Sequence, residues 1–152
     1  MVSLRSILAP TLSLLAAVHV YAETHTIVFE NHRGFGTPIL KLPNGPTLST
    51  GAAFTINGPL IGAIAFLQTG SCGTNGEGCT VIEITLKNPS SPGTGSTVVI
   101  DPTQFSVTTG FGYFNGCDGI GQDCTNPNCP SPLPPNGLCP TNDVNLAIVF
   151  CD

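Results

Sequence analysis

Short runs in which apolar and polar residues alternate recur along most of the chain. In the clearest, residues 80–86, Ile82, Ile84 and Leu86 lie on one face of an extended chain and Glu83 on the other. A period of two residues is typical of a β-strand with one buried face. We therefore predict a strand here, and similar runs predict strands at residues 24–30, 39–42, 53–56, 61–69, 97–100, 105–114 and 145–150.

Two of these predictions carry further expectations. In residues 24–30 we expect Ile27 and Phe29 on one side, with His25 near the other. This run and residues 39–42, which a Pro-Asn-Gly-Pro turn follows, are expected to pair as a hairpin. A helix is the alternative for residues 61–69, but that run is short and glycines flank it.

Residues 115–142 are mostly Gly, Pro, Asn, Asp and Cys. We expect no regular element in this arm, which disulfides would hold in shape. Seven or eight short strands without a persuasive helix predict an all-β fold, an antiparallel sandwich or barrel. The 18 glycines and 14 prolines do not indicate disorder, because 41% of the chain is hydrophobic and only 9% is charged.

The first 22 residues resemble a secretory signal peptide in their pattern. Arg5 precedes an apolar segment that ends at Val20, and small residues come before a break after Ala22. A membrane anchor is the alternative, but Pro10 interrupts the segment, which is shorter than the ~20 residues that span a bilayer. We expect a secreted, extracellular protein without a membrane span, and residues 23–152 have the size of one domain.

The net charge of residues 23–152 argues against two classes of binding partner. Residues 23–152 contain three Lys or Arg and nine Asp or Glu, a net charge of −6 with His neutral. Nucleic acid is not an expected partner, because no basic stripe exists to neutralise phosphates. Anionic membranes would repel such a surface.

All seven cysteines lie between Cys72 and Cys151. Outside the cell they predict disulfides, and an odd number leaves one thiol free or intermolecular. The four that cluster in the arm have spacings of seven, five and ten residues, unlike those of zinc sites: Cys117, Cys124, Cys129 and Cys139. We expect neither a metal nor another cofactor.

Five segments, in their order, resemble the thaumatin-like proteins, which are secreted defence-related proteins of plants and fungi. They are a Ser-Thr-Gly step leading to a Phe-Thr-Ile strand, a Thr-Gly-Ser-Cys strand end, an Asn-Gly-Glu-Gly-Cys loop, a Val-Ile-Glu-Ile-Thr-Leu strand and a Phe-Ser-Val-Thr-Thr-Gly-Phe strand, at residues 49–56, 69–72, 75–79, 81–86 and 105–111. The resemblance covers residues 26–113 and 145–151. Length and the Gly-Phe-Gly-Tyr-Phe-Asn-Gly-Cys-Asp-Gly segment also resemble a truncated fungal form, the small secreted mushroom proteins labelled "glycopeptide".

This resemblance implies a β-sandwich in which Cys72 pairs with Cys79. The family's first strand carries a cysteine that closes onto the last cysteine of the chain, and Arg33 stands at that position here. Cys151 has then lost its partner. The alternative is that Cys151 pairs within the arm and another thiol is free. The four arm cysteines admit three pairings, and the sequence does not choose among them.

The resemblance also implies a site. Glu83 matches a glutamate of the family's acidic cleft, whereas Thr109 and Gln104 stand where the family has aspartates. Asp101 lies nearby and would have to substitute. Ordinary glycosidases need two carboxyl groups across the scissile bond, so a weak β-1,3-glucanase using Glu83 and Asp101 is the secondary hypothesis.

The leading hypothesis is non-enzymatic, lectin-like carbohydrate binding, to β-glucan or a cell-surface glycan, in an antifungal defence or developmental setting. The expected ligand-binding residues are Glu83, Gln104, Tyr113 and Asn115, with Tyr113 and Asn115 exposed and Phe111 in the core. A third hypothesis is a small cysteine-rich structural or interaction protein, a homodimer joined through Cys151.

Overall fold

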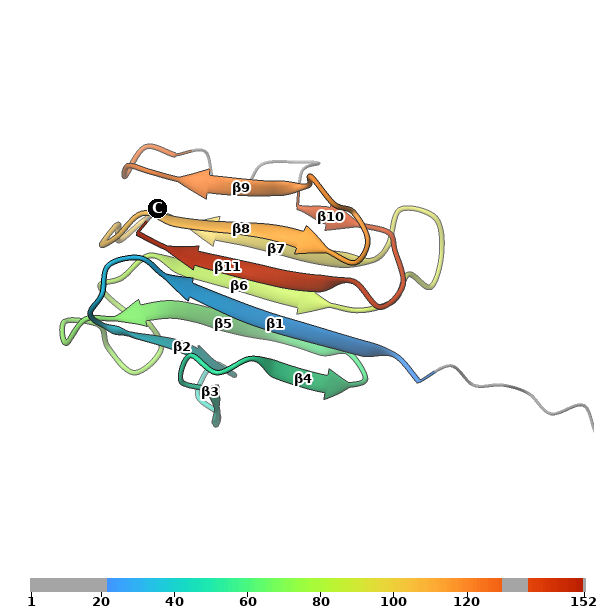
Figure 1. Cartoon of the computed structure of the whole chain (residues 1–152), viewed down its shortest axis with the longest axis horizontal. Helices are drawn as coiled ribbons and strands as arrows, with labels where there is room; N and C mark the ends of the chain where they lie inside the picture. Colours follow the sequence, from blue (N-terminus) through green and yellow to red (C-terminus); the bar gives the residue numbers. More distant parts are fainter. Residues whose placement is uncertain (1–21, 130–136, 152) are drawn as a thin grey trace, which may run out of the picture.

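The computed structural model describes residues 22–129 and 137–151, and these residues form eleven β-strands and no helix (Figure 1). The all-β fold class predicted from the alternation is confirmed. The strands are β1 (Thr24–Asn31), β2 (Thr37–Lys41), β3 (Thr47–Ser49), β4 (Phe54–Asn57), β5 (Leu60–Gln68), β6 (Val81–Leu86), β7 (Ser96–Asp101), β8 (Thr109–Phe114), β9 (Gly121–Cys124), β10 (Leu138–Cys139) and β11 (Asn145–Phe150).

The strands form two sheets that share one hydrophobic core. One sheet has the order β4-β1-β11-β8-β9 and the other β10-β7-β6-β5-β2-β3. Leu40 and Ile84 from the six-stranded sheet belong to the same buried cluster as Ile148 and Phe150 from the five-stranded sheet. The two sheets therefore make a sandwich.

Strand β6 shows how the sequence pattern sets the faces. Ile82, Ile84 and Leu86 are each 1% exposed or less, and Glu83 between them is exposed. The run at residues 61–69, for which a helix was the alternative, forms strand β5, which pairs with both β6 and β2. The predicted alternation of residues 80–86 is confirmed.

Two expectations about pairing are wrong. Strands β1 and β2 form no hairpin, because β1 pairs with β4 and β11 while β2 pairs with β3 and β5 in the other sheet. The turn between them contains Gly34 and Gly36, both with positive φ, and it carries the chain from one sheet to the other. The sandwich is also not wholly antiparallel, because β1 and β11 run parallel.

The arm contains regular structure that the sequence did not predict. Strand β9 pairs with β8 at one sheet edge, and β10 pairs with β7 at the edge of the other sheet. Disulfides join Cys117 to Cys139 and Cys124 to Cys129. In contrast, the strand predicted over residues 105–114 begins only at Thr109.

The predicted signal peptide, residues 1–22, lies outside the described residues except for Ala22. The described part of the chain has no helix that is long and apolar enough to cross a membrane. Cleavage after Ala22 and a single domain over residues 23–152 remain predictions.

Candidate functional site

Glu83 and Asp101 lie on the same outer face of the six-stranded sheet. In the β6–β7 ladder Glu83 is opposite Val99, and Val81 is opposite Asp101. The two carboxylates are thus diagonal neighbours, a relation that places Cα atoms about 7–8 Å apart. The structure brings these two predicted residues onto one surface.

A small open cavity of about 180 Å³ lies beside Asp101 on this face, and we call it the acidic pocket. Glu83 does not line it. Its second carboxylate is instead Glu77, and its lining is otherwise neutral and mostly polar: Asn75, Cys79, Val81, Thr103 and Gln104. Of the predicted ligand-binding residues, Gln104 is therefore in the pocket and Glu83 is beside it.

The disulfide loop that carries Glu77 is held in one conformation. Cys72 pairs with Cys79, the pairing that the resemblance implied. Backbone hydrogen bonds close the turns inside the loop, from Gly73 N to the Glu77 carbonyl (2.7 Å) and from Cys79 N to the Gly76 carbonyl (3.0 Å). Gly76 has φ +83°, and a Cβ there would lie 2.7 Å from a methyl carbon of Val81. Only glycine fits at this position without a shift.

Two residues from β2 and the turn after it tie the same loop to the sheet. The Lys41 ammonium donates to the Thr74 carbonyl (2.8 Å). Asn44 N donates to Asn75 Oδ1 (2.9 Å), and Asn75 Nδ2 donates back to Asn44 Oδ1 (3.0 Å). The wall of the acidic pocket is therefore preorganised by neutral and charge-assisted hydrogen bonds.

Glu77 is held as a carboxylate. The backbone N–H of Asn75 donates to Glu77 Oε2 (2.8 Å), and this bond, followed by one from the Glu77 backbone, lowers the pKa of the side chain below its usual 4.5. The positive charge of Lys41 contributes in the same direction. Glu77 is thus ionised at neutral pH and acts as a hydrogen-bond acceptor there.

Asp101 and Gln104 each have one side-chain oxygen that accepts hydrogen bonds from within the protein. Asp101 Oδ1 accepts from Thr103 N (2.9 Å) and from the Thr103 hydroxyl, and Gln104 Oε1 accepts from Gly78 N. Among the described residues, none is hydrogen-bonded to Asp101 Oδ2 or Gln104 Nε2. The pocket therefore offers both an acceptor and a donor to a ligand, the combination that a sugar hydroxyl requires.

Tyr113 does not belong to this site. Its side chain is 4% exposed, its hydroxyl donates to the Gly137 carbonyl (2.7 Å), and its ring packs edge-on against Phe111 with 5.9 Å between centroids. Burial raises the pKa of the phenol. The expectation of an exposed Tyr113 is wrong, because Tyr113 and Phe111 alternate with two glycines and so share the inward face of β8. Phe111 is in the core as expected.

Asn115 is exposed, but it lies far from Gln104. It follows the last residue of β8, with φ +58°, whereas Gln104 precedes the first. The six residues of β8, an extended span of about 20 Å, lie between them in the chain. Asn115 also follows a strand of the five-stranded sheet, so the structure does not bring it together with Glu83.

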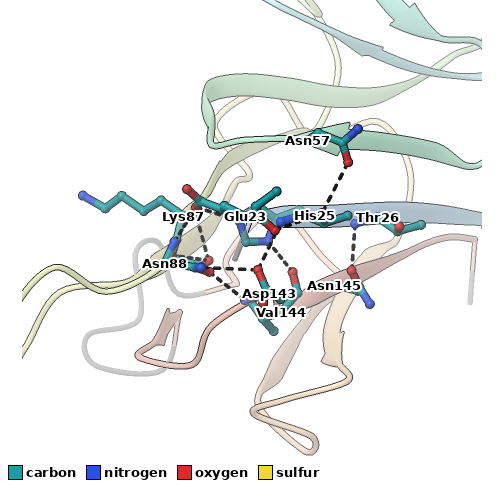
Figure 2. Close-up of polar contacts among 12 residues, drawn as sticks. Glu23, His25, Thr26, Asn57, Lys87, Asn88, Asp143, Val144 and Asn145 are labelled. Carbon is teal, nitrogen blue, oxygen red and sulfur yellow. Dashed lines mark hydrogen bonds and ion pairs between the residues drawn. The ribbon is translucent and has the colours of Figure 1, made fainter. Parts of the chain in front are cut away.

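A second polar cluster, which the sequence did not predict, surrounds His25 (Figure 2). His25 is fully buried on the same face of β1 as Ile27, so the expectation that placed them on opposite sides is wrong. Its ring nitrogens contact the Val144 carbonyl (2.7 Å) and the Glu23 carboxylate (3.0 Å). Glu23 also accepts a hydrogen bond from Asn88 N.

This cluster joins three segments that are distant in sequence. Asp143 N donates to Asn88 Oδ1 (2.6 Å), and Asp143 Oδ1 accepts from Thr24 N (3.1 Å) and Asn88 Nδ2 (3.3 Å). The start of β1, the end of β6 and the turn before β11 are thereby linked (Figure 2). Because the His25 ring has no exposed surface, the histidine–carboxylate pair has no access to a substrate, and its role is structural.

Cys151 is the free cysteine, since the other six form three disulfides. It is half-buried, and its backbone N–H donates to the Thr108 carbonyl (2.8 Å). Arg33 is exposed, with its guanidinium carbon 4.1 Å from the centroid of the Phe35 ring.

No known protein family has a sequence profile that matches this chain, and no curated protein is significantly similar to it. The described residues contain no group of three or more His, Cys, Asp or Glu side chains placed to hold a metal ion. The polar groups that line the acidic pocket are carboxylates, amides and the Thr103 hydroxyl.

Proposed function

We propose that this protein is a secreted, non-enzymatic carbohydrate-binding protein related to the thaumatin-like family, and that the acidic pocket binds a neutral β-glucan. The observation that carries the proposal is the convergence of two carboxylates and two amides on one open cavity: Asp101, Glu77, Asn75 and Gln104. The proposed family relationship rests on the motifs at residues 49–86 and 105–111. The two-sheet fold and the Cys72–Cys79 loop agree with it, and three disulfides agree with secretion.

The state of Glu77 argues against a general-acid role for this residue of the acidic pocket. A glycosidase needs one carboxylic acid that stays protonated to donate to the leaving oxygen. The hydrogen bonds to Glu77 lower its pKa and so keep it ionised. Glu77 then serves as an acceptor for sugar hydroxyls, and Oδ2 of Asp101 offers a second acceptor by its geometry.

The test is a pull-down of the purified protein on insoluble β-1,3-glucan, with released reducing sugar assayed in the same tubes. We expect binding without sugar release. Gln104→Ala and Asp101→Ala should weaken binding about tenfold each, because each removes a hydrogen bond to the ligand and one of them is charged. Glu30→Gln removes an exposed carboxylate on the other sheet and should change nothing.

The same assay tests the glucanase hypothesis. Sugar release that disappears in Glu83→Gln would show that Glu83 and Asp101 act as a catalytic pair across a substrate lying on the outer face. If the insoluble glucan retains the wild-type protein and Asp101→Ala equally, the acidic pocket does not bind β-1,3-glucan.

A further inference from the structure

A second, larger cavity of about 430 Å³ opens on the outer face of the six-stranded sheet. We call it the lysine groove, and it is lined by Lys87, Thr85, Thr97, Ile61, Leu138 and residues 93–95. Thr85 is opposite Thr97 at one end of the β6–β7 ladder, whereas Asp101 of the acidic pocket is opposite Val81 at the other. The two cavities are therefore separate.

The wall of the groove is well ordered. Thr94 Oγ1 accepts from Ser90 N and Ser91 N (3.0 Å each) and donates to the Ser91 carbonyl (2.7 Å), which holds the loop before β7. On the opposite side a bulge in β5, at Gly62 with φ +63°, leaves Ile61 57% exposed. Ile61 is one of only two large hydrophobic side chains exposed to this degree among the described residues.

Two hydroxyls of the groove, those of Thr85 and Thr97, are available to donate to a ligand. Gly62 N donates to Thr85 Oγ1 (3.1 Å), so the Thr85 O–H remains to donate elsewhere. Thr97 is exposed, and its hydroxyl makes no hydrogen bond to a described residue. Among the described residues, no carboxylate lines the cavity.

Lys87 supplies the only charge among the described residues of the lining. Its ammonium group has no hydrogen-bond or ion-pair partner among the described residues, and Figure 2 shows the side chain extending away from the buried cluster. The other two cations of the described chain differ, since Lys41 bonds to the Thr74 carbonyl and Arg33 lies over Phe35. An unpaired ammonium beside two hydroxyl donors favours an anionic ligand.

We propose that the lysine groove binds a carboxylated sugar of the uronic acid class. The ammonium and the Thr85 and Thr97 hydroxyls would bind the carboxylate and a neighbouring oxygen. Ile61 and Leu138 would contact the apolar face of the ring, a contact that a small acid such as acetate, which has no ring, does not make. The cavity is within the range of about 300–1,000 Å³ usual for small-molecule sites. This proposal does not depend on the acidic pocket being a glucan site.

The test is a titration of the purified ¹⁵N-labelled protein with glucuronate, followed by amide chemical shifts, with glucose and acetate as comparison ligands. We expect saturable shifts at Lys87, Gly93, Gly95 and Thr97. Lys87→Gln should weaken binding about tenfold or more, because a hydrogen bond to a charged group is lost. Thr97→Val, which keeps the branched shape of an exposed residue, should weaken it several-fold.

Arg33→Gln is the matched control, because it removes an exposed positive charge elsewhere and should leave binding unchanged. Three results would overturn the assignment: no saturable shift at these residues with glucuronate, equal binding of glucose, or equal binding of acetate. Unchanged glucuronate binding in Lys87→Gln would also overturn it. Binding of glucuronate that weakens with added salt and with Lys87→Gln would support it.

Discussion

Two buried polar side chains hold distant parts of this molecule together. The Tyr113 hydroxyl reaches out of β8 to the Gly137 carbonyl, and so fastens the arm that returns to β10. His25 contacts an acceptor on each side of its ring and links β1 to the turn before β11. In both cases a polar group is buried with its hydrogen bonds satisfied, which makes its removal costly.

The burial of the Tyr113 phenol predicts that the protein loses stability at high pH. It is the only tyrosine in residues 23–152, so its ultraviolet absorption reports on one group. Burial raises its pKa in the folded protein, whereas in the unfolded chain it is about 10. The stabilisation is therefore complete below about pH 10 and is lost as the pH rises above it. An alkaline spectrophotometric titration should show tyrosinate appearing together with unfolding followed by circular dichroism. Ionisation at about pH 10 with the fold intact would contradict the burial of Tyr113.

His25→Ala should destabilise the protein by about 2–4 kcal/mol, because it leaves a cavity and unpaired partners in the Glu23–Asn88 cluster. Urea denaturation measures this as a lower midpoint at an unchanged slope. His32→Ala, at an exposed histidine, is the control and should stay within about 0.5 kcal/mol of the wild type. Equal stability of the two variants would mean that the His25 cluster does not hold β1 in place.

At the level of elements, the long strands with clean alternation were predictable. Strands β6 and β11 follow it, because one face of each is buried against the opposite sheet. Strands β9 and β10 were not predictable, since four and two residues with Gly, Asp, Gln or Cys carry no periodic signal. They become strands by pairing with β8 and β7. The choice of partners, including the parallel β1–β11 pair, depends on contacts far apart in sequence.

One part of the candidate site was predictable from the alternation, and another part was not. Glu83 and Asp101 lie on the neighbouring strands β6 and β7, in which successive residues alternate between the buried and the outer face. Their shared face follows from this period of two. Glu77 lies in a glycine-rich loop, and nothing local in the sequence says that this loop folds over the end of β7. The only indication of this loop's structure in the sequence was the expected pairing of Cys72 with Cys79, which lie on either side of Glu77.

The disulfide between Cys117 and Cys139 should contribute substantially to the stability of the arm. It closes a loop of 22 residues, for which the chain-entropy model gives about 3 kcal/mol. Replacing both cysteines by Ser should lower the free energy of unfolding by roughly that amount and increase amide exchange in β9 and β10 first. The Cys124–Cys129 pair, closing a shorter loop of five residues, should have a smaller effect when replaced in the same way. Equal losses would contradict this assignment.

At the level of the whole molecule, two of the cavities share one outer face. The outer face of the six-stranded sheet carries both the acidic pocket and the lysine groove, at opposite ends of one ladder. The two cavities have opposite chemistry, with two carboxylates in one and a single ammonium in the other. A ligand that spans this face would meet both sites.

We expect the protein to be a monomer with one free thiol. Cys151 is half-buried beside the Thr108 backbone, so its thiol should react slowly with maleimide in the folded protein and rapidly in denaturant. Non-reducing electrophoresis should then show a single monomer band. A dimer that is abolished by Cys151→Ser would instead support the hypothesis of a structural protein joined through this residue.

The most direct test of the central claim is to map where a short β-1,3-glucan oligosaccharide binds, by amide chemical-shift perturbation of the ¹⁵N-labelled protein. We predict saturable shifts that cluster at Asn75, Gly78, Thr103 and Gln104, with none over the outer face of the five-stranded sheet. Shifts centred on Asn115 or elsewhere, or no saturable shift at all, would contradict the assignment of the acidic pocket as the glucan site.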